Sequence, residues 1–123
     1  MEERRGEFSA HVRQVGATAV IDMHGEINGQ ADAALSAAYT AAESGQPTAV
    51  LLNFSGVDYI NSTGIALIVG LLAQARKAHR PLSTYGLSPH YQEIFRITRL
   101  SDFMTMYADE AAALHGAAAG SGS

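Results

Sequence analysis

The chain has 123 residues, no cysteine and a formal net charge of -4. This length corresponds to one domain, large enough to bury a core without disulfides or metals. The lack of cysteine excludes disulfide frameworks, thiolate metal sites and cysteine nucleophiles. The acidic balance argues against a protein that binds nucleic acid directly. With 47% hydrophobic and 16% charged residues, the composition is that of a folded protein.

Neither a membrane span nor a secretion signal is predicted. The longest apolar stretch, residues 65–73, contains a glycine and is far shorter than the about 20 residues that a span needs. The first five residues, Met-Glu-Glu-Arg-Arg, are too polar for a signal peptide. We therefore expect a small cytoplasmic domain without membrane insertion.

The first half of the chain predicts a hairpin, a helix and a buried strand. Residues 8–15 and 17–24 alternate with period two and are joined by a short link. After a turn over residues 25–29, the alanine-rich residues 30–44 favour a helix. Residues 48–54 follow with an unbroken apolar run, typical of a strand covered on both faces and parallel to the second strand.

The second half alternates helices and strands. A loop over residues 55–60 is expected to lead into a long helix with a broad apolar stripe, residues 62–79. A strand (82–85), a helix (91–98), a strand (103–107) and a helix (109–114) follow. The order predicts a single α/β domain over residues 8–115, with a mixed, mostly parallel sheet and about four helices. Residues 1–7 and 116–123 are expected to be flexible ends.

The most informative segment lies where the predicted loop enters the long helix. Asn61, Ser62 and Thr63 are residue types that cap a helix start, whereas Gly64 is unfavourable in a first turn and suggests a close approach to the backbone. A helix N-terminus favours negative charge. A phosphate on Ser62 would therefore be tolerated and would add about -1.5 to -2 charges, so we predict that Ser62 is a phosphorylation site.

This segment resembles the STAS domain of bacterial anti-sigma factor antagonists. The likeness is carried by Asn61-Ser62-Thr63-Gly64-Ile65, preceded by Leu51-Leu52-Asn53-Phe54 and Val57-Asp58-Tyr59-Ile60. The Gly25-Glu26-Ile27 turn is similar to the family's Gly-Glu-Leu. Leu87-Ser88-Pro89, followed by Phe95 and Leu100, resembles the family's passage from the fourth strand to the third helix. The likeness covers about residues 8–115 in the family's element order.

The resemblance implies a partner switch and no enzymatic activity. In this family the serine matching Ser62 is phosphorylated by an anti-sigma factor, a serine kinase with a GHKL-type ATP site. The unphosphorylated antagonist binds the kinase and releases a sigma factor, and a PP2C-type phosphatase restores the unphosphorylated form. We expect the interface around Ser62 to involve Asn28, Gly29, Asn61, Thr63 and Gly64.

Two residues depart from the family's pattern. Asn61 and Asn28 stand where the family usually has aspartate, and both remove a negative charge without changing shape. They bear on the choice of kinase more than on the fold. The alternative reading is a non-switching STAS scaffold, as in stressosome-like assemblies, or a regulator associated with a transporter.

Other chemistries are poorly supported. Ser62 lacks the first glycine of a nucleophile elbow, and the five histidines share no metal-ligand spacing. Residues 25–29 lack the glycine pattern of a nucleotide-binding loop, although weak nucleotide binding stays open. Arg76, Lys77 and Arg80 are interpreted as a solvated helix end, where positive charge suits the helix dipole. We therefore predict neither a metal site nor a cofactor.

Overall fold

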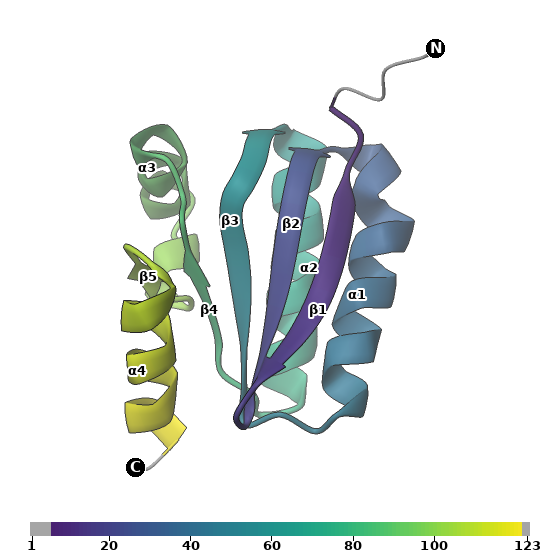
Figure 1. Cartoon of the computed structure of the whole chain (residues 1–123). Coiled ribbons are helices and arrows are strands. Elements are labelled where there is room, and N and C mark those ends of the chain that lie inside the picture. The colour runs from purple at the N-terminus through teal and green to yellow at the C-terminus, as the bar shows by residue number, and fades with distance from the viewer. Residues whose placement is uncertain (1–5, 122–123) are drawn as a thin grey trace.

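A sheet of five strands in chain order organises the computed structural model, which describes residues 6–121 (Figure 1). β1 (Ser9–Val15) and β2 (Thr18–Ile27) form an antiparallel hairpin. The remaining neighbours are parallel, and these strands are β3 (Ala49–Ile60), β4 (Leu82–Tyr85) and β5 (Met106–Tyr107). The predicted hairpin and mixed, mostly parallel sheet are confirmed.

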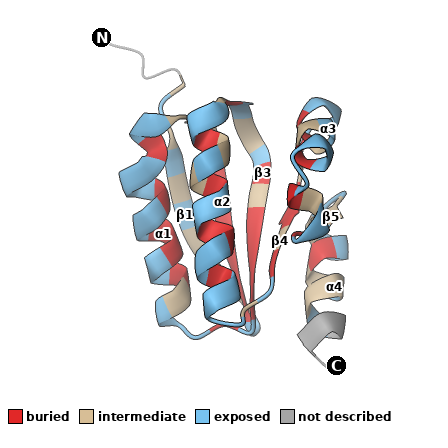
Figure 2. Cartoon of the chain, turned by 180° about the vertical axis from the view of Figure 1, so that it is seen from behind, coloured by how far each residue is buried: buried red, intermediate tan, exposed pale blue. Residues whose placement is uncertain are grey.

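Helices lie on both faces of the sheet. α1 (Asp32–Ser44) and α2 (Ser62–Lys77) run side by side over one face, as Figures 1 and 2 show. Right-handed crossovers between successive parallel strands place both helices on that face. α3 (Pro89–Ile97) packs at the β4 side, and α4 (Glu110–Ser121) lies against the opposite face.

Two clusters of unequal size form the core. The larger lies under α1 and α2, where the residues of β2 and β3 that share one face meet the buried stripe of α2, including Ile68, Leu72 and Ala75. The smaller cluster lies on the other face and joins Val20 and Leu51 to Ala113 of α4. Because β3 is covered on both faces, its apolar residues run without a break, as the sequence predicted.

The predicted loop over residues 55–60 is wrong, because β3 continues to Ile60. β2 likewise continues to Ile27 through the predicted turn. The register between the two strands shifts at two irregularities, between Asp22 and His24 and between Gly25 and Glu26. The two bulges accommodate the irregular segments around Gly25 and Gly56. Both strands therefore continue to their carboxyl ends, next to the start of α2.

The C-terminal third also differs from expectation. The predicted strand over residues 103–107 is reduced to β5, and a 3₁₀ turn over Leu100–Asp102, which was not predicted, precedes it. The predicted end of the last helix at residue 114 is wrong, since α4 continues to Ser121. Among residues 6–121, none of the helices combines the length and apolar character needed to cross a membrane.

The predicted flexible ends overlap the described residues only in part. Residues 1–5 and 122–123 lie outside the described residues. At the N-terminal side, the amide of Glu26 donates to the carbonyl of Gly6 at 2.9 Å, so the chain contacts the domain from Gly6 onward. At the C-terminal side, residues 116–121 are part of α4.

Candidate functional site

Ser62 is the first residue of α2 and is exposed. Asn61 before it is the N-cap, and its Oδ1 accepts a hydrogen bond from the Gly64 amide at 2.8 Å. The amide of Asn61 itself donates to the carbonyl of Ile27 at 3.2 Å, and Ile65 donates to the Asn61 carbonyl at 2.9 Å. The predicted cap is confirmed, and it ties the start of α2 to the end of β2.

The cap leaves two amides of the first turn unpaired. Within the described residues, those of Asn61, Gly64 and Ile65 are bonded, whereas the amides of Ser62 and Thr63 have no partner. Free amides and the positive end of the helix dipole favour an anion at this point. The Ser62 hydroxyl therefore lies where a phosphate would be stabilised by the domain itself.

Gly64 is buried, and its hydrogen side chain is a steric requirement. A Cβ atom at this position would lie 2.0 Å from the Ile27 carbonyl oxygen and 2.9 Å from Cγ2 of Ile60. The sequence predicted that something approaches the backbone here, and the approaching group is the domain's own β2. A direct contact of Gly64 with a partner stays a prediction, and burial makes its contribution one of positioning Ser62.

The Asn28–Gly29 turn lies beside the start of α2. The Asn28 side chain accepts a hydrogen bond from the Gln30 amide at 2.9 Å and caps a 3₁₀ turn over Gly29–Ala31. A Cβ on Gly29 would lie 3.6 Å from Cγ2 of Thr63. Gly29, Ser62 and Thr63 are exposed, so the structure brings the two predicted contact segments together on one surface.

Asn28 and Asn61, where the resemblance described above implies aspartate, perform local structural roles. Each uses its carboxamide oxygen as a helix or turn cap, and each is half-buried. An aspartate oxygen would accept the same bond. The substitution therefore preserves the geometry around Ser62 and removes only negative charge.

Tyr91 and Tyr59 belong to this region, although neither was predicted as a site residue. The buried hydroxyl of Tyr91, from α3, accepts a hydrogen bond from the Ile60 amide at 2.9 Å and so holds the end of β3. Tyr59 is 51% exposed, an unusual position for a large aromatic side chain next to a strand end. Tyr59 is three residues before Ser62 in the chain, and Tyr91 contacts Ile60, which is two residues before Ser62.

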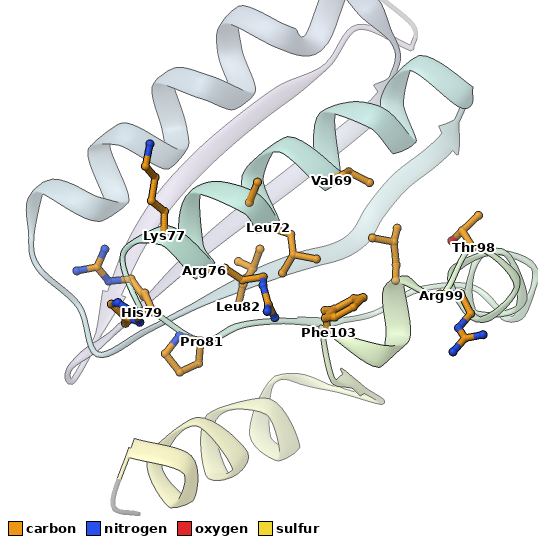
Figure 3. Close-up of a pocket in the computed structure, with 13 residues that line it drawn as sticks. Val69, Leu72, Arg76, Lys77, His79, Pro81, Leu82, Thr98, Arg99 and Phe103 are labelled. Carbon is orange, nitrogen blue, oxygen red and sulfur yellow. The ribbon is translucent and has the colours of Figure 1, made fainter.

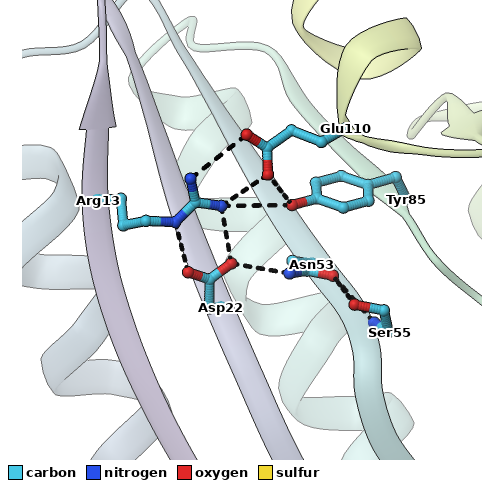
Figure 4. Close-up of polar contacts among 6 residues, drawn as sticks. All are labelled: Arg13, Asp22, Asn53, Ser55, Tyr85 and Glu110. Atoms are coloured by element: carbon cyan, nitrogen blue, oxygen red, sulfur yellow. Dashed lines mark hydrogen bonds and ion pairs between the residues drawn. The ribbon is translucent and has the colours of Figure 1, made fainter.

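A separate polar cluster on the other face of the sheet fixes α4 (Figure 4). Arg13 bridges Asp22, at 2.5 Å from Nε to Oδ2, and Glu110, at 2.7 Å from Nη2 to Oε1. Tyr85 donates to the same Glu110 oxygen at 2.6 Å, and Asn53 donates to Asp22 at 2.8 Å. The hydrogen bonds from Arg13 lower the pKa values of both Asp22 and Glu110. The cluster is therefore a structural bridge between β1, β2 and α4.

Metal and nucleophile chemistry find no support in the described part of the chain. No group of three histidine, aspartate or glutamate residues is placed to hold a metal ion within residues 6–121. Over the same residues, no hydrogen bond joins Ser62 to a histidine. The start of α2 instead presents the exposed Ser62 hydroxyl, the unpaired amides of Ser62 and Thr63, and the adjacent exposed residue Gly29.

The fold and the site are thus a five-stranded α/β domain with an exposed serine at the first residue of α2. Comparison with known families identifies it further. The family described as "Mlab, STAS domain" matches residues 10–107. The chain belongs to the STAS domain family.

The curated relatives that match are anti-sigma-B factor antagonists of Staphylococcus aureus. The protein from strain NCTC 8325 is 34% identical over 55 residues, which are 45% of this chain and 51% of the relative. The chain thus spans about half the length of the curated relatives it matches. These relatives are named as regulatory antagonists, in agreement with the prediction that the chain is not an enzyme.

Solved structures agree on the fold. An anti-sigma factor antagonist from Mycobacterium paratuberculosis has a TM-score of 0.79 at 20% identity, covering 91% of this chain and 95% of that one. The unphosphorylated form of the anti-sigma factor antagonist SpoIIAA has a TM-score of 0.70 at 19% identity, with coverages of 91% and 99%. The phosphorylated form of the Bacillus protein has a TM-score of 0.67 at 22% identity, with coverages of 87% and 98%. The predicted fold class and family are confirmed.

Proposed function

We propose that this protein is an anti-sigma factor antagonist whose binding to an anti-sigma serine kinase is controlled by phosphorylation of Ser62. The observation that carries the proposal is the exposed Ser62 hydroxyl on the first residue of α2, beside two unpaired amides. The names of the Staphylococcus aureus relatives support the antagonist role. The phosphorylated form of SpoIIAA, a protein of the same fold, supports the modification.

The proposed switch acts on the surface and leaves the fold intact. A phosphate at Ser62 gains the free amides and the helix dipole, which favour it by about 0.3–1 kcal/mol. A kinase that packs against Ser62, Thr63 and Gly29 would have to bury about -1.5 to -2 added charges. An unpaired buried charge at an interface costs about 2–5 kcal/mol. Phosphorylation should therefore weaken binding by at least about 30-fold.

The rim around Ser62 would supply the rest of the interface. Gly29 and Thr63, which lie next to each other, present small exposed surfaces near Ser62. Asn28 and Asn61 would contribute uncharged polar side chains, and Gly64 would allow α2 to pack closely against β2. A kinase suited to this chain should accordingly lack the cations that would pair with aspartates at these two positions.

The test needs a candidate GHKL-type kinase from the same organism, chosen from the genes that neighbour the gene for this protein. The full chain, Ser62→Ala and Thr63→Ala are each incubated with kinase and ATP and examined by mass spectrometry. We expect one phosphate on the full chain and on Thr63→Ala, and none on Ser62→Ala. Binding of Ser62→Ala and Ser62→Glu to the kinase is then compared by calorimetry, with weaker binding expected for Ser62→Glu. A PP2C-type phosphatase should remove the phosphate.

Two results would count against the switch. A phosphate found on Thr63 and not on Ser62 would show that Ser62 is not the phosphorylated residue. An unmodified chain, together with equal kinase binding by Ser62→Ala and Ser62→Glu, would favour the non-switching scaffold, because a charge at the centre of the interface would then be without effect.

A further inference from the structure

A second surface lies at the other end of α2, where a groove separates that helix from the segment after α3 (Figure 3). Its volume is about 1130 Å³. Its apolar floor is formed by Val69, Leu72, Leu82, Leu100 and Phe103. Its lining residues on α2 begin at Val69, about 10 Å beyond Ser62 along the helix, and its first cation there, Arg76, is about 21 Å beyond Ser62. The groove is therefore distinct from the surface around Ser62.

Exposed hydrophobic side chains gather at this groove. Among the described residues, four large hydrophobic side chains are exposed, namely Tyr59, Val69, Ile97 and Phe103. Val69 and Phe103 line the groove, and Ile97 directly precedes the lining residue Thr98. Two of the four exposed large hydrophobic side chains thus line this groove, beside buried leucines that form its floor.

Positive charge surrounds the apolar floor. The groove is lined by four of the chain's eight Lys and Arg residues, although the chain has a net charge of -4. These four are Arg76, Lys77, Arg80 and Arg99. The helix dipole accounts for cations in the last turn of α2, but Arg80 and Arg99 come from beyond α2. The interpretation of a solvated helix end is thus incomplete, because the cations of two segments converge here.

Two of these cations lack a carboxylate partner. Arg80 pairs with Glu43 at 3.1 Å, and Arg99 pairs with Asp102 at 2.8 Å. Within residues 6–121, neither Arg76 nor Lys77 forms an ion pair. The Arg76 guanidinium carbon lies 5.0 Å from the centre of the Phe103 ring, and Figure 3 shows both side chains at the groove. An unpaired cation is thus held directly above an exposed aromatic floor.

We propose that this groove binds an acidic amphipathic helix of a partner protein. The apolar row of the helix would lie on Val69, Leu72 and Phe103, while its flanking carboxylates would pair with Arg76 and Lys77. A groove bordered by helical segments suits a helix, whose side chains repeat on one face every three to four residues. Partner carboxylates supply the negative charge that the unpaired cations lack.

A second copy of this chain fits the groove less well. The exposed faces of α1 and α4 are rich in alanine and carry no row of large apolar side chains among the described residues, and the short α3 offers only Ile97 and the partly buried Ile94. They would leave the floor of the groove partly uncovered. The charge and the shape of the groove therefore favour a different protein.

The test uses a fluorescein-labelled 16-residue peptide with leucines at helical spacing and glutamates flanking them. Its control peptide carries lysine in place of every glutamate. Fluorescence polarisation at low salt should show binding of the acidic peptide, at least tenfold weaker binding of the lysine peptide, and loss of affinity as salt rises. Arg76→Glu should lower the affinity for the acidic peptide at least tenfold, and Val69→Asp should lower it by a similar factor.

The matched control is Arg96→Glu, which makes the same charge change at an exposed residue of α3 outside the groove lining. It should change affinity by less than threefold. Should Arg76→Glu fail to fold, Arg76→Gln removes the charge with less disturbance and should weaken binding at least threefold. Circular dichroism establishes the fold of each variant.

Three results would overturn the proposal. The first is equal binding of the acidic and lysine peptides. The second is an equal effect of Arg76→Glu and Arg96→Glu. The third is Arg76-dependent binding to phosphatidylglycerol vesicles without binding of the acidic peptide, which would assign the groove to a membrane surface. All three readouts are separate from the phosphorylation of Ser62, so the groove and the proposed switch stand or fall independently.

Discussion

Gly64 provides a sharp test of how the start of α2 is positioned. In an exposed helix interior, replacing glycine by alanine stabilises the fold by roughly 0.5–1 kcal/mol. At Gly64 the added methyl carbon would lie 2.0 Å from the Ile27 carbonyl oxygen and 2.8 Å from its carbonyl carbon, against at least 3.4 Å for an ordinary contact. Both atoms are backbone, so they have no rotamer by which to move away. The helix itself would have to shift from β2.

The expected cost follows from this overlap. Overpacking a buried site costs about 1–3 kcal/mol, occasionally more. A shift of α2 would also weaken the hydrogen bond from the Asn61 amide to Ile27. After subtracting the helix-propensity gain, Gly64→Ala should lower the free energy of unfolding by about 2 kcal/mol. With a urea dependence of about 1–3 kcal/mol per molar, the midpoint should fall by roughly 1 M.

Gly70 on the same helix is the matched control. It is exposed, and a Cβ there would meet nothing within 4 Å. Urea unfolding followed by circular dichroism should show Gly70→Ala to be more stable than the unmodified chain and Gly64→Ala less stable. If Gly64→Ala gained stability as Gly70→Ala does, the tight packing of α2 on β2 would be wrong.

Three further predictions concern the cap, the core and the polar cluster. Asn61→Ala should lower the unfolding free energy by about 1 kcal/mol through loss of the N-cap, while Asn61→Asp should keep it; equal urea midpoints for the two would argue against the capping bond. Thr84→Val should raise the stability by about 1 kcal/mol, because the buried Thr84 hydroxyl lacks a partner in the described structure; a lower melting temperature would show that the hydroxyl is satisfied. Arg13→Ala should cost roughly 1 kcal/mol at pH 7, a value reduced by solvent exposure. Since Arg13 lowers the pKa values of Asp22 and Glu110 in the fold, its stabilising effect is present above about pH 4 and is lost as the pH falls below that value. Urea unfolding of both proteins at pH 7 and pH 2.5 checks this, and an unchanged difference would contradict it.

Local patterns were sufficient for the elements whose burial is regular. The period-two alternation of residues 17–24 and the broad apolar stripe of α2 are set by the faces these elements bury, so the sequence alone locates them. The cap at Asn61 is also local, since the donor and the acceptor are three residues apart. Asn28 and Gly29 are distant from Ser62 in sequence, and the family resemblance, not a local pattern, predicted that they lie beside it.

Elements fixed by distant partners were not predictable in this way. The end of β3 contains Ser55, Gly56 and Asp58, which are typical of loops, yet it pairs with β2 across two bulges. The alanine- and glycine-rich end of α4 resembles a disordered tail. It packs on Tyr107, where a Cβ on Gly116 would lie 2.0 Å from the tyrosine hydroxyl. The partner of β3 is distant in sequence, and Tyr107 belongs to the strand before α4, so neither contact is visible in the composition of the segment itself.

The groove was missed because its residues come from separate segments. Arg76 and Lys77 have an adequate local explanation in the dipole of α2. Only the fold places Arg99 and Phe103 across from them. A binding surface assembled from two segments has no spacing by which a sequence pattern would reveal it.

The position of both surfaces on one helix raises the question of whether they influence each other. Ser62 and Arg76 are about 21 Å apart along α2, more than twice the screening length of about 8 Å at physiological salt. The helix between them is held by buried residues, including Ile68, Leu71 and Ala75, so an exposed charge at its first residue has no means of shifting its last turn. Ser62→Glu should therefore leave the affinity of the acidic peptide for the groove within twofold, measured by polarisation at physiological salt. A larger change would mean that α2 moves between two positions, and the rigid packing inferred from Gly64 and the buried stripe would be refuted.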